Sequence, residues 1–193
     1  MRLSQLQGAI LAGGRATRMG GQDKGLVQLN GQPLWQRVYT RLAPQTGGVM
    51  ISANRNIAEY QKSGLPVVQD TLSGFPGPLA GMLAVLASSD REWFLFCPCD
   101  VPGIPQDLAR RLWENKQAAP AAWVHDGERD HPTIALVHRR LQAPLREYLQ
   151  AGERRVMVFL RQAGGVPVSF AGQHSAFANV NSPDDLILWQ ENN

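Results

Sequence analysis

The sequence predicts an α/β protein with a largely parallel sheet and helices on both of its faces. Short, unbroken apolar runs alternate with segments of helical spacing over most of the chain. Such runs are typical of parallel strands that are buried on both faces, and the intervening helices are the crossovers that parallel strands require. A glycine-rich turn follows the first apolar run, at the place where such sheets bind ligands.

Four apolar runs are interpreted as the parallel strands, and each is followed by a helical pattern or a turn. The helices have apolar residues three or four positions apart, and Pro33 suits the first turn of the first helix. The expected strands are Gly8 to Leu11, Val49 to Ser52, Pro66 to Gln69 and Trp93 to Cys97, and the expected helices are Pro33 to Leu42, Leu79 to Ala87 and Pro105 to Lys116.

The pattern changes after Pro120. An Asp126-Gly127 turn signal between two apolar runs predicts an antiparallel hairpin. Ser182 and Pro183, followed by two acids, form a good helix start. The expected elements are hairpin strands Ala121 to His125 and His131 to Val137, a helix from Val156 to Gln162, and short strands Val166 to Phe170 and Phe177 to Val180.

Composition limits the class of protein. The chain has 193 residues, of which 44% are hydrophobic, and these numbers suit one domain spanning residues 1–193. A net charge of +3 without a dense basic stripe argues against nucleic-acid binding and allows a small anionic substrate. The absence of a signal-peptide core and of a long apolar run predicts a cytoplasmic protein. Cys97 and Cys99 lack a second cysteine pair and are interpreted as buried free thiols.

The stretch from Ile10 to Lys24 carries the strongest functional signal. It contains four glycines, two arginines and a lysine, but only one acid. Such a loop bends tightly, exposes backbone N–H groups and surrounds them with positive charge, which is how a protein binds a phosphate chain. Its spacing fits neither the dinucleotide fingerprint nor the P-loop. The sequence therefore predicts a nucleoside triphosphate site of another kind, in which Arg18 and Lys24 contact phosphate oxygens.

Two acids follow predicted strands and should meet this loop at the carboxyl edge of the sheet. Asp100 directly follows a buried run between Pro98 and Pro102, and a carboxylate there suits magnesium, which takes few protein oxygens. The alternative for Asp100 is a cap of the following turn. Asp70 is a candidate for a ribose, base or metal-bound water, or for a purely structural role.

The other polar candidates are weaker. Arg154 and Arg155 suit the anionic part of a second substrate, and an exposed helix face explains them equally well. Asn179 and Asn181 suit a polar ligand or a loop backbone. His125 and His131 lack a clear third ligand, so a structural or exposed role is favoured over a metal pair.

These features together resemble a known family, the molybdenum cofactor guanylyltransferases (molybdopterin-guanine dinucleotide synthases, the MobA family). The resemblance covers essentially the whole chain and implies a three-layer α/β/α Rossmann-like nucleotidyltransferase fold with a mostly parallel mixed sheet. The segments that carry it are Leu11-Ala12-Gly13-Gly14, Arg18-Met19-Gly20, Asp23-Lys24-Gly25, Asn30-Gly31-Gln32-Pro33-Leu34, Gly77-Pro78-Leu79-Ala80-Gly81, Cys97-Pro98-Cys99-Asp100 and Asn179-Val180-Asn181-Ser182-Pro183.

The resemblance implies an activity: GMP passes from GTP to the terminal phosphate of molybdenum-molybdopterin, and pyrophosphate leaves. It implies Mg²⁺ as cofactor, a monomer, and transient contacts with molybdoenzymes or their chaperones. A nucleotide-binding part would reach about residue 117, and a molybdopterin-binding part would follow. The implied nucleotide residues are Leu11, Ala12, Gly13, Gly14, Lys24, Ser52, Asp70 and Asp100, with Arg18, Lys24 and Asp100 catalytic and Asp100 holding the metal. The implied molybdopterin residues are Arg155, Asn179 and Asn181.

One departure and three alternatives stay open at the level of sequence. Related proteins carry asparagine where this chain has Ser52, so a guanine or ribose contact there is an open point. The nearest alternative is a nucleotidyltransferase that uses CTP on molybdopterin or on another phosphorylated acceptor. A non-catalytic nucleotide-binding regulator would bind GTP without releasing pyrophosphate. A chaperone of pterin cofactors would leave the glycine loop unexplained.

Overall fold

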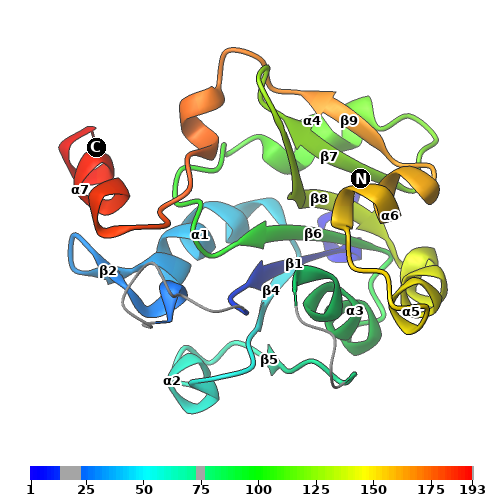
Figure 1. The fold of residues 1–193 in the computed structure, drawn as a ribbon, viewed down its shortest axis with the longest axis horizontal. Helices are drawn as coiled ribbons and strands as arrows, with labels where there is room; N and C mark the ends of the chain where they lie inside the picture. The colour runs from blue at the N-terminus through cyan, green and yellow to red at the C-terminus, as the bar shows by residue number, and fades with distance from the viewer. Residues whose placement is uncertain (14–22, 73–76, 193) are drawn as a thin grey trace.

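The core of the fold is a seven-stranded sheet with the strand order β5-β4-β1-β6-β8-β7-β9 (Figure 1). The computed structural model describes residues 1–13, 23–72 and 77–192. Neighbouring strands run parallel except where β8 pairs with β6 and with β7. The predicted mostly parallel mixed sheet is therefore confirmed. Its strands are β1 (Leu6–Leu11), β4 (Gly48–Ser52), β5 (Val67–Val68), β6 (Trp93–Pro98), β7 (Ala121–His125), β8 (Asp130–His138) and β9 (Val166–Ser169).

Helices cover both faces of the sheet and complete the predicted three layers. Side chains of α1 and α4 pack on one face, and those of α3, α5 and α6 pack on the other. No helix within the described ranges is long and apolar enough to cross a membrane. The α-helices of this part of the chain are α1 (Leu34–Leu42), α2 (Ile57–Gln61), α3 (Pro78–Ser88), α4 (Leu108–Asn115), α5 (Gln142–Gln150), α6 (Val156–Gln162) and α7 (Pro183–Asn192).

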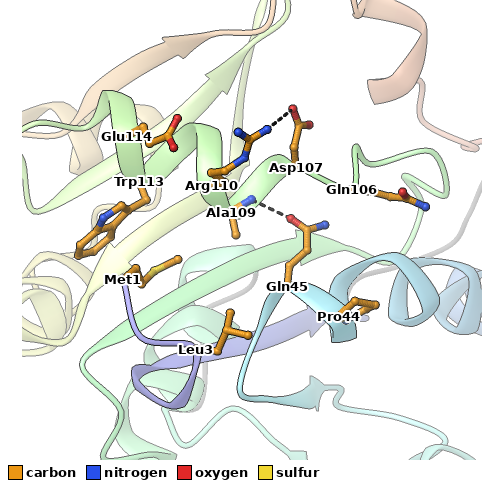
Figure 2. Close-up of a pocket in the computed structure, with 10 residues that line it drawn as sticks. All are labelled: Met1, Leu3, Pro44, Gln45, Gln106, Asp107, Ala109, Arg110, Trp113 and Glu114. Carbon is orange, nitrogen blue, oxygen red and sulfur yellow. Dashed lines mark hydrogen bonds and ion pairs between the residues drawn. The ribbon is translucent and has the colours of Figure 1, made fainter.

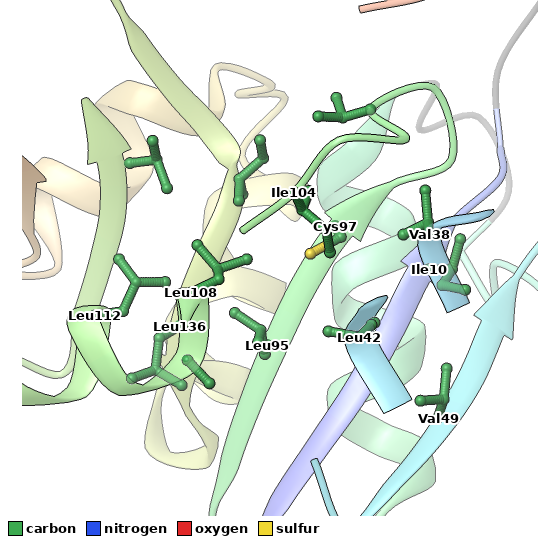
Figure 3. Close-up of a cluster of buried hydrophobic side chains, with 14 of the residues drawn as sticks. Ile10, Val38, Leu42, Val49, Leu95, Cys97, Ile104, Leu108, Leu112 and Leu136 are labelled. Atoms are coloured by element: carbon green, nitrogen blue, oxygen red, sulfur yellow. The ribbon is translucent and has the colours of Figure 1, made fainter. Parts of the chain in front are cut away.

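The face under α1 and α4 shows why these sequence patterns form these elements. Leu42 of α1 and Leu112 of α4 are fully buried and belong to the same hydrophobic cluster as Leu95 of β6 (Figure 3). Both helices carry apolar residues at spacings of three or four, so one stripe of each helix meets the sheet. Cys97 and Cys99 are free and buried, as predicted, and burial raises the pKa of both thiols. They are part of the packing of this face.

Most predicted elements are present with small shifts of their ends. The helix expected from Pro105 begins only at Leu108, because Pro105 to Asp107 form a turn in which the Leu108 N–H donates to the Pro105 carbonyl at 3.3 Å. The structure also contains elements that the sequence did not predict, namely α2, α5 and a small hairpin of β2 (Gln28–Leu29) and β3 (Gln32–Pro33).

The strand expected from Phe177 to Val180 is wrong. Phe177 ends a 3-10 helix, η6 (His174–Phe177), and the residues after it are extended without a strand partner. Phe177 packs into the core under α4, whereas Val180 packs into a separate small cluster with Leu34 of α1. The two apolar side chains thus anchor a connecting segment at two points. A backbone hydrogen bond, from the Val180 N–H to the Asp100 carbonyl at 2.8 Å, ties that segment to the residues that follow β6.

A buried carboxylate fixes the turn of the β7–β8 hairpin against η6. Asp126 is 1% exposed and accepts hydrogen bonds from the backbone N–H groups of Glu128 and Arg129. Its second oxygen lies 2.6 Å from Nε2 of His131 and 2.9 Å from Nδ1 of His174. Burial by itself raises the pKa of Asp126, but these hydrogen bonds outweigh it and hold the pKa well below its usual range. His131 therefore has the structural role that the sequence favoured.

Replacing Asp126 by asparagine is expected to lower the free energy of unfolding at neutral pH by about 2 to 4 kcal/mol, because buried partners lose their acceptor. The pKa of Asp126 is lower in the folded state, so its contribution is full above the unfolded pKa of about 3.9 and is lost as pH falls below that value. Urea unfolding at several pH values should therefore show the wild type and variant converging in acid. Asp90→Asn, an exposed carboxylate, is the matched control, and an equal gap at every pH would contradict the account.

Candidate active site

The predicted site residues follow strands whose carboxyl ends share one edge of the sheet. In Figure 1 the arrowheads of β1 and β6 point to the same side, on which α7 lies. Backbone hydrogen bonds join the residues just past the strand ends. The Ala12 N–H donates to the Ser52 carbonyl at 2.8 Å, and the Cys99 N–H donates to the Leu11 carbonyl at 3.0 Å. The segments after β1, β4 and β6 are thereby held in register.

A cavity of about 380 Å³ opens at this edge. Six of the sequence-predicted residues line it: Leu11, Gly13, Lys24, Ser52, Asp70 and Asp100. Ala12 lies behind the wall, where it is 5% exposed. Gly14 and Arg18 fall in the range 14–22, outside the described residues. The rest of the lining is Asn54, Gly77, Pro78, Gly81, Pro98, Cys99 and Thr133.

Lys24 and Asp100 form the charged centre of this cavity. The Lys24 Nζ lies 3.6 Å from Oδ2 of Asp100 and donates a 2.8 Å hydrogen bond to Oδ1 of Asn181. The two charged side chains are 28% and 12% exposed, so solvent screens their interaction less than at the open surface. Burial raises the pKa of Asp100 above its ordinary value, although the Lys24 ammonium acts in the opposite direction. A carboxylate in this environment is favoured by any further cation.

Asp70 is held by an asparagine that the sequence reading did not single out. The Asn54 Nδ2 donates to Oδ2 of Asp70 at 2.9 Å, and the Asp70 backbone N–H donates to Oδ1 of Asn54 at 2.9 Å. The other carboxylate oxygen of Asp70 is buried, and no described residue forms a hydrogen bond with it. Burial raises the pKa of Asp70, and the hydrogen bond from Asn54 partly opposes the rise. A ligand with an N–H or O–H donor would satisfy the unpaired oxygen.

Ser52 contributes to the shape of the cavity. It is 2% exposed, and a Cβ added at Gly81 would lie 2.7 Å from its hydroxyl oxygen. Gly81 therefore lets the first turn of α3 approach the end of β4 closely. Gly77, which precedes α3, has a φ of +111°, a backbone conformation that favours glycine. Both glycines lie in Gly77-Pro78-Leu79-Ala80-Gly81, one of the segments that carry the family resemblance in the sequence.

The predicted molybdopterin residues are not all brought together. Asn181 reaches the cavity centre through Lys24. Asn179 instead lines a neighbouring cavity of about 510 Å³ with residues of η6 and α7, and its buried Oδ1 has no hydrogen-bond partner in the described part of the chain. Arg155 is exposed, directly precedes α6, and lines neither cavity. Their role stays a sequence-based prediction.

A larger cavity, of about 630 Å³, contains none of the predicted residues (Figure 2). It lies between the N-terminal residues and α4, where Oδ2 of Asp107 pairs with the Arg110 guanidinium at 3.6 Å and the Ala109 N–H donates to Oε1 of Gln45. Asp107 and Arg110 are therefore paired with each other. Size alone does not make it the functional site.

Comparison with known proteins shows to which family the chain belongs. A model of the MobA-like NTP transferase domain matches residues 8–166. The molybdenum cofactor guanylyltransferase of Serratia proteamaculans (strain 568) is 53% identical over 187 residues, covering 97% of this chain and 95% of the relative. The chain belongs to the molybdenum cofactor guanylyltransferase family. The enzyme of that name from Yersinia pseudotuberculosis serotype O:1b (strain IP 31758) is 49% identical over 186 residues, covering 96% of this chain and 95% of the relative.

Solved structures agree on the fold of this guanylyltransferase. Molybdopterin-guanine dinucleotide biosynthesis protein A from Archaeoglobus fulgidus has a TM-score of 0.79 at 21% identity, covering 96% of this chain and 97% of that one. A CMP:2-keto-3-deoxy-manno-octonic acid synthetase has a TM-score of 0.75 at 17% identity, covering 96% and 97%. The predicted fold, the nucleotidyltransferase class and a role in molybdopterin guanine dinucleotide synthesis by GMP transfer are thus confirmed.

Proposed function

We propose that the cavity at the carboxyl edge binds GTP with Mg²⁺ and is where GMP is transferred to the terminal phosphate of molybdenum-molybdopterin. The observation that carries this proposal is the position of the Lys24 ammonium, 3.6 Å from the buried Asp100 carboxylate in a cavity bordered by the segment after β1. Nucleotidyl transfer requires positive charge and a carboxylate that can bind a metal ion, and both line this cavity. The residues up to about 117 would bind the nucleotide, and those after it the molybdopterin.

The donor set at Asp100 fits Mg²⁺. This ion is usually bound by one or two carboxylates, with waters and substrate phosphates as its other ligands. Asp100 supplies one such carboxylate in a place where burial disfavours its negative charge. Among the described residues there is no group of three or more side chains suited to a fully protein-bound metal. Bound here with GTP, Mg²⁺ would neutralise charge on the phosphates.

The remaining nucleotide contacts follow from the cavity walls. Leu11 ends β1, Ala12 and Gly13 follow it, and Lys24 lines the same cavity as Leu11 and Gly13. Lys24 would hold phosphate oxygens, because its ammonium is partly exposed to the cavity. Asp70 would accept a hydrogen bond from a nucleotide donor through its unpaired oxygen. Ser52 lines the same cavity and would contact the base or ribose.

The acceptor would enter beside Asn181. Its Oδ1 accepts from Lys24, so an acceptor phosphate near Asn181 would lie next to the charge that holds GTP. Asn179 and Arg155 would contact the molybdopterin farther from the reacting atoms. The product would pass on through transient contacts with molybdoenzymes or their chaperones, and the enzyme would act as a monomer.

The reaction needs no covalent enzyme intermediate and no general base. The terminal phosphate of molybdopterin is an oxyanion at neutral pH, so one of its oxygens forms a bond to the α-phosphorus of GTP. The bond from that phosphorus to the bridging oxygen of the β-phosphate breaks, and pyrophosphate leaves with the electron pair. The task of the protein is to align two anions and to offset their repulsion, which Lys24 does by its fixed charge.

The test is pyrophosphate release from GTP, CTP, UTP and ATP, measured with and without molybdenum-molybdopterin. The proposal expects release from GTP only when the acceptor is present, with formation of the guanine dinucleotide product. Preference for CTP would contradict the guanylyl assignment. Nucleotide binding without release, whatever the acceptor, would contradict transfer at this site.

Asn54 offers a sharper test of the nucleotide pocket. Asn54→Ala should raise the KM for GTP by about threefold to tenfold, because Asp70 loses the side-chain donor that orients it. The variant should leave the free energy of unfolding nearly unchanged, since the truncated residue, Asn54, is exposed to solvent. Asn115→Ala, an exposed asparagine on α4, is the matched control. Steady-state kinetics with GTP checks the prediction, and an unchanged KM would remove the Asn54–Asp70 pair from nucleotide binding.

A further inference from the structure

A buried carboxylate precedes the lysine at the centre of the site. Asp23 is 7% exposed and lies at the start of the 3-10 helix η3 (Lys24–Leu26). Its Oδ1 accepts hydrogen bonds from the Tyr60 hydroxyl at 2.7 Å and from the Gly25 N–H at 3.1 Å. Its Oδ2 accepts from Nδ2 of Asn56 at 3.2 Å. One of the three donors belongs to η3 itself, and the other two belong to α2 and to Asn56, the residue that precedes it.

The donors are themselves fixed. Tyr60 is fully buried, and burial is the main cause that raises the pKa of its hydroxyl, which therefore remains a hydrogen-bond donor. Asn56 has a φ of +54°, which is uncommon for a residue other than glycine, and its carbonyl accepts the Tyr60 N–H at 3.2 Å. The side chain and the main chain of Asn56 thus hold both Asp23 and the first turn of α2.

Glycine is required at position 25 by the same contact. A Cβ added to Gly25 would collide with the Tyr60 hydroxyl. The absence of a side chain lets that hydroxyl lie against the backbone of η3. Asp23 and Gly25 are therefore both held to Tyr60, and Lys24 stands between them. Its side chain leaves this fixed backbone and reaches Asn181 and Asp100, which come from other segments.

We propose that Asp23 and Tyr60 are positioning residues for Lys24. Neither lines the cavity, so they act on the reaction only through the turn that carries the lysine. A small displacement of the ammonium weakens its interaction with the phosphate. The loss is greatest in the transition state, where negative charge develops. This inference rests on the proposed phosphate contact of Lys24.

The test is a double-mutant cycle between Tyr60→Phe and Lys24→Ala. The activity of each variant is measured as pyrophosphate release from GTP with molybdenum-molybdopterin. Tyr60→Phe keeps the ring and removes one hydrogen bond to Asp23, so kcat/KM should fall about fivefold to tenfold, with most of the loss in kcat. In the Lys24→Ala background the same substitution should change kcat/KM by less than about twofold. The dissociation constant for GTP, measured by titration, gives the cycle a second readout.

Two further variants serve as an alternative to Tyr60→Phe and as its control. Asn56→Gly suits the positive φ and removes the second side-chain donor, so it should show the same dependence on Lys24 if Tyr60→Phe proves unstable. Tyr39→Phe, on α1, is the matched control and should leave kcat unchanged. If Tyr60→Phe lowers kcat/KM equally with and without Lys24, the positioning role of Tyr60 is overturned, but the role proposed for Lys24 is not. Wild-type kinetics of the Lys24→Ala single variant would instead overturn the role proposed for Lys24, and this inference with it.

Discussion

Replacing Asp100 by asparagine is expected to lower kcat by about two to three orders of magnitude, the usual loss when a fixed transition-state contact is removed. The amide keeps the size of the side chain and its place at the end of β6, but it supplies no negative charge to a metal ion. Burial raises the pKa of Asp100 and so disfavours its negative charge, which a cation bound beside it would stabilise. Steady-state pyrophosphate release at several Mg²⁺ concentrations measures the effect.

The matched control is Asp90→Asn, which removes an exposed carboxylate between α3 and β6 and should leave kcat unchanged. Circular dichroism and thermal unfolding should show that the Asp100→Asn protein is folded. Full magnesium-dependent turnover of this variant would exclude Asp100 as the metal ligand, and Asp100 would then be a turn cap.

Replacing Lys24 by alanine is expected to raise the KM for GTP and to lower kcat, with a total loss in kcat/KM of about two orders of magnitude. The ammonium lies between Asp100 and Asn181, so its removal takes positive charge from the point where donor and acceptor phosphates would meet. Part of the loss would pass through Asp100, because the Lys24 charge opposes the rise of its pKa.

Lys62→Ala removes an exposed lysine paired only at the surface of α2 with Glu59, and it is the matched control for the change of net charge. Varying GTP at saturating acceptor separates KM from kcat. A rate that equals wild type at every GTP concentration would remove Lys24 from the site, whereas a change in KM alone would limit it to binding GTP.

The local parts of the fold were predictable because each follows from short-range pattern. The buried strands β1, β4 and β6 each contain an apolar run that predicted them. The Ser182 hydroxyl caps α7 by accepting from the Asp185 N–H at 3.2 Å, as its sequence position predicts. The segment from Phe177 to Val180 has the composition of a strand. Its structure depends on two separate apolar clusters that only the assembled fold creates, so the sequence could not reveal it.

The residues of the site likewise include some that the sequence could predict and some that it could not. The acids after β5 and β6 and the lysine after the glycine loop were predictable, because parallel strands bring their carboxyl ends to one edge. The Asn54 side chain was not, since its function depends on a pairing with Asp70 across two chain segments. Asn179 and Asn181 are two positions apart, yet they line different parts of the surface. A segment without a strand partner has no fixed alternation from which their directions could be inferred.

The most direct test of the central claim is a crystal structure of the enzyme with GTP, Mg²⁺ and a non-reacting acceptor. We expect the nucleotide in the cavity between Gly13, Asp70 and Asp100, with the metal ion on the Asp100 carboxylate and a phosphate oxygen within hydrogen-bond distance of the Lys24 Nζ. GTP bound elsewhere, or in this cavity with its phosphates directed away from Lys24 and Asp100, would contradict the account.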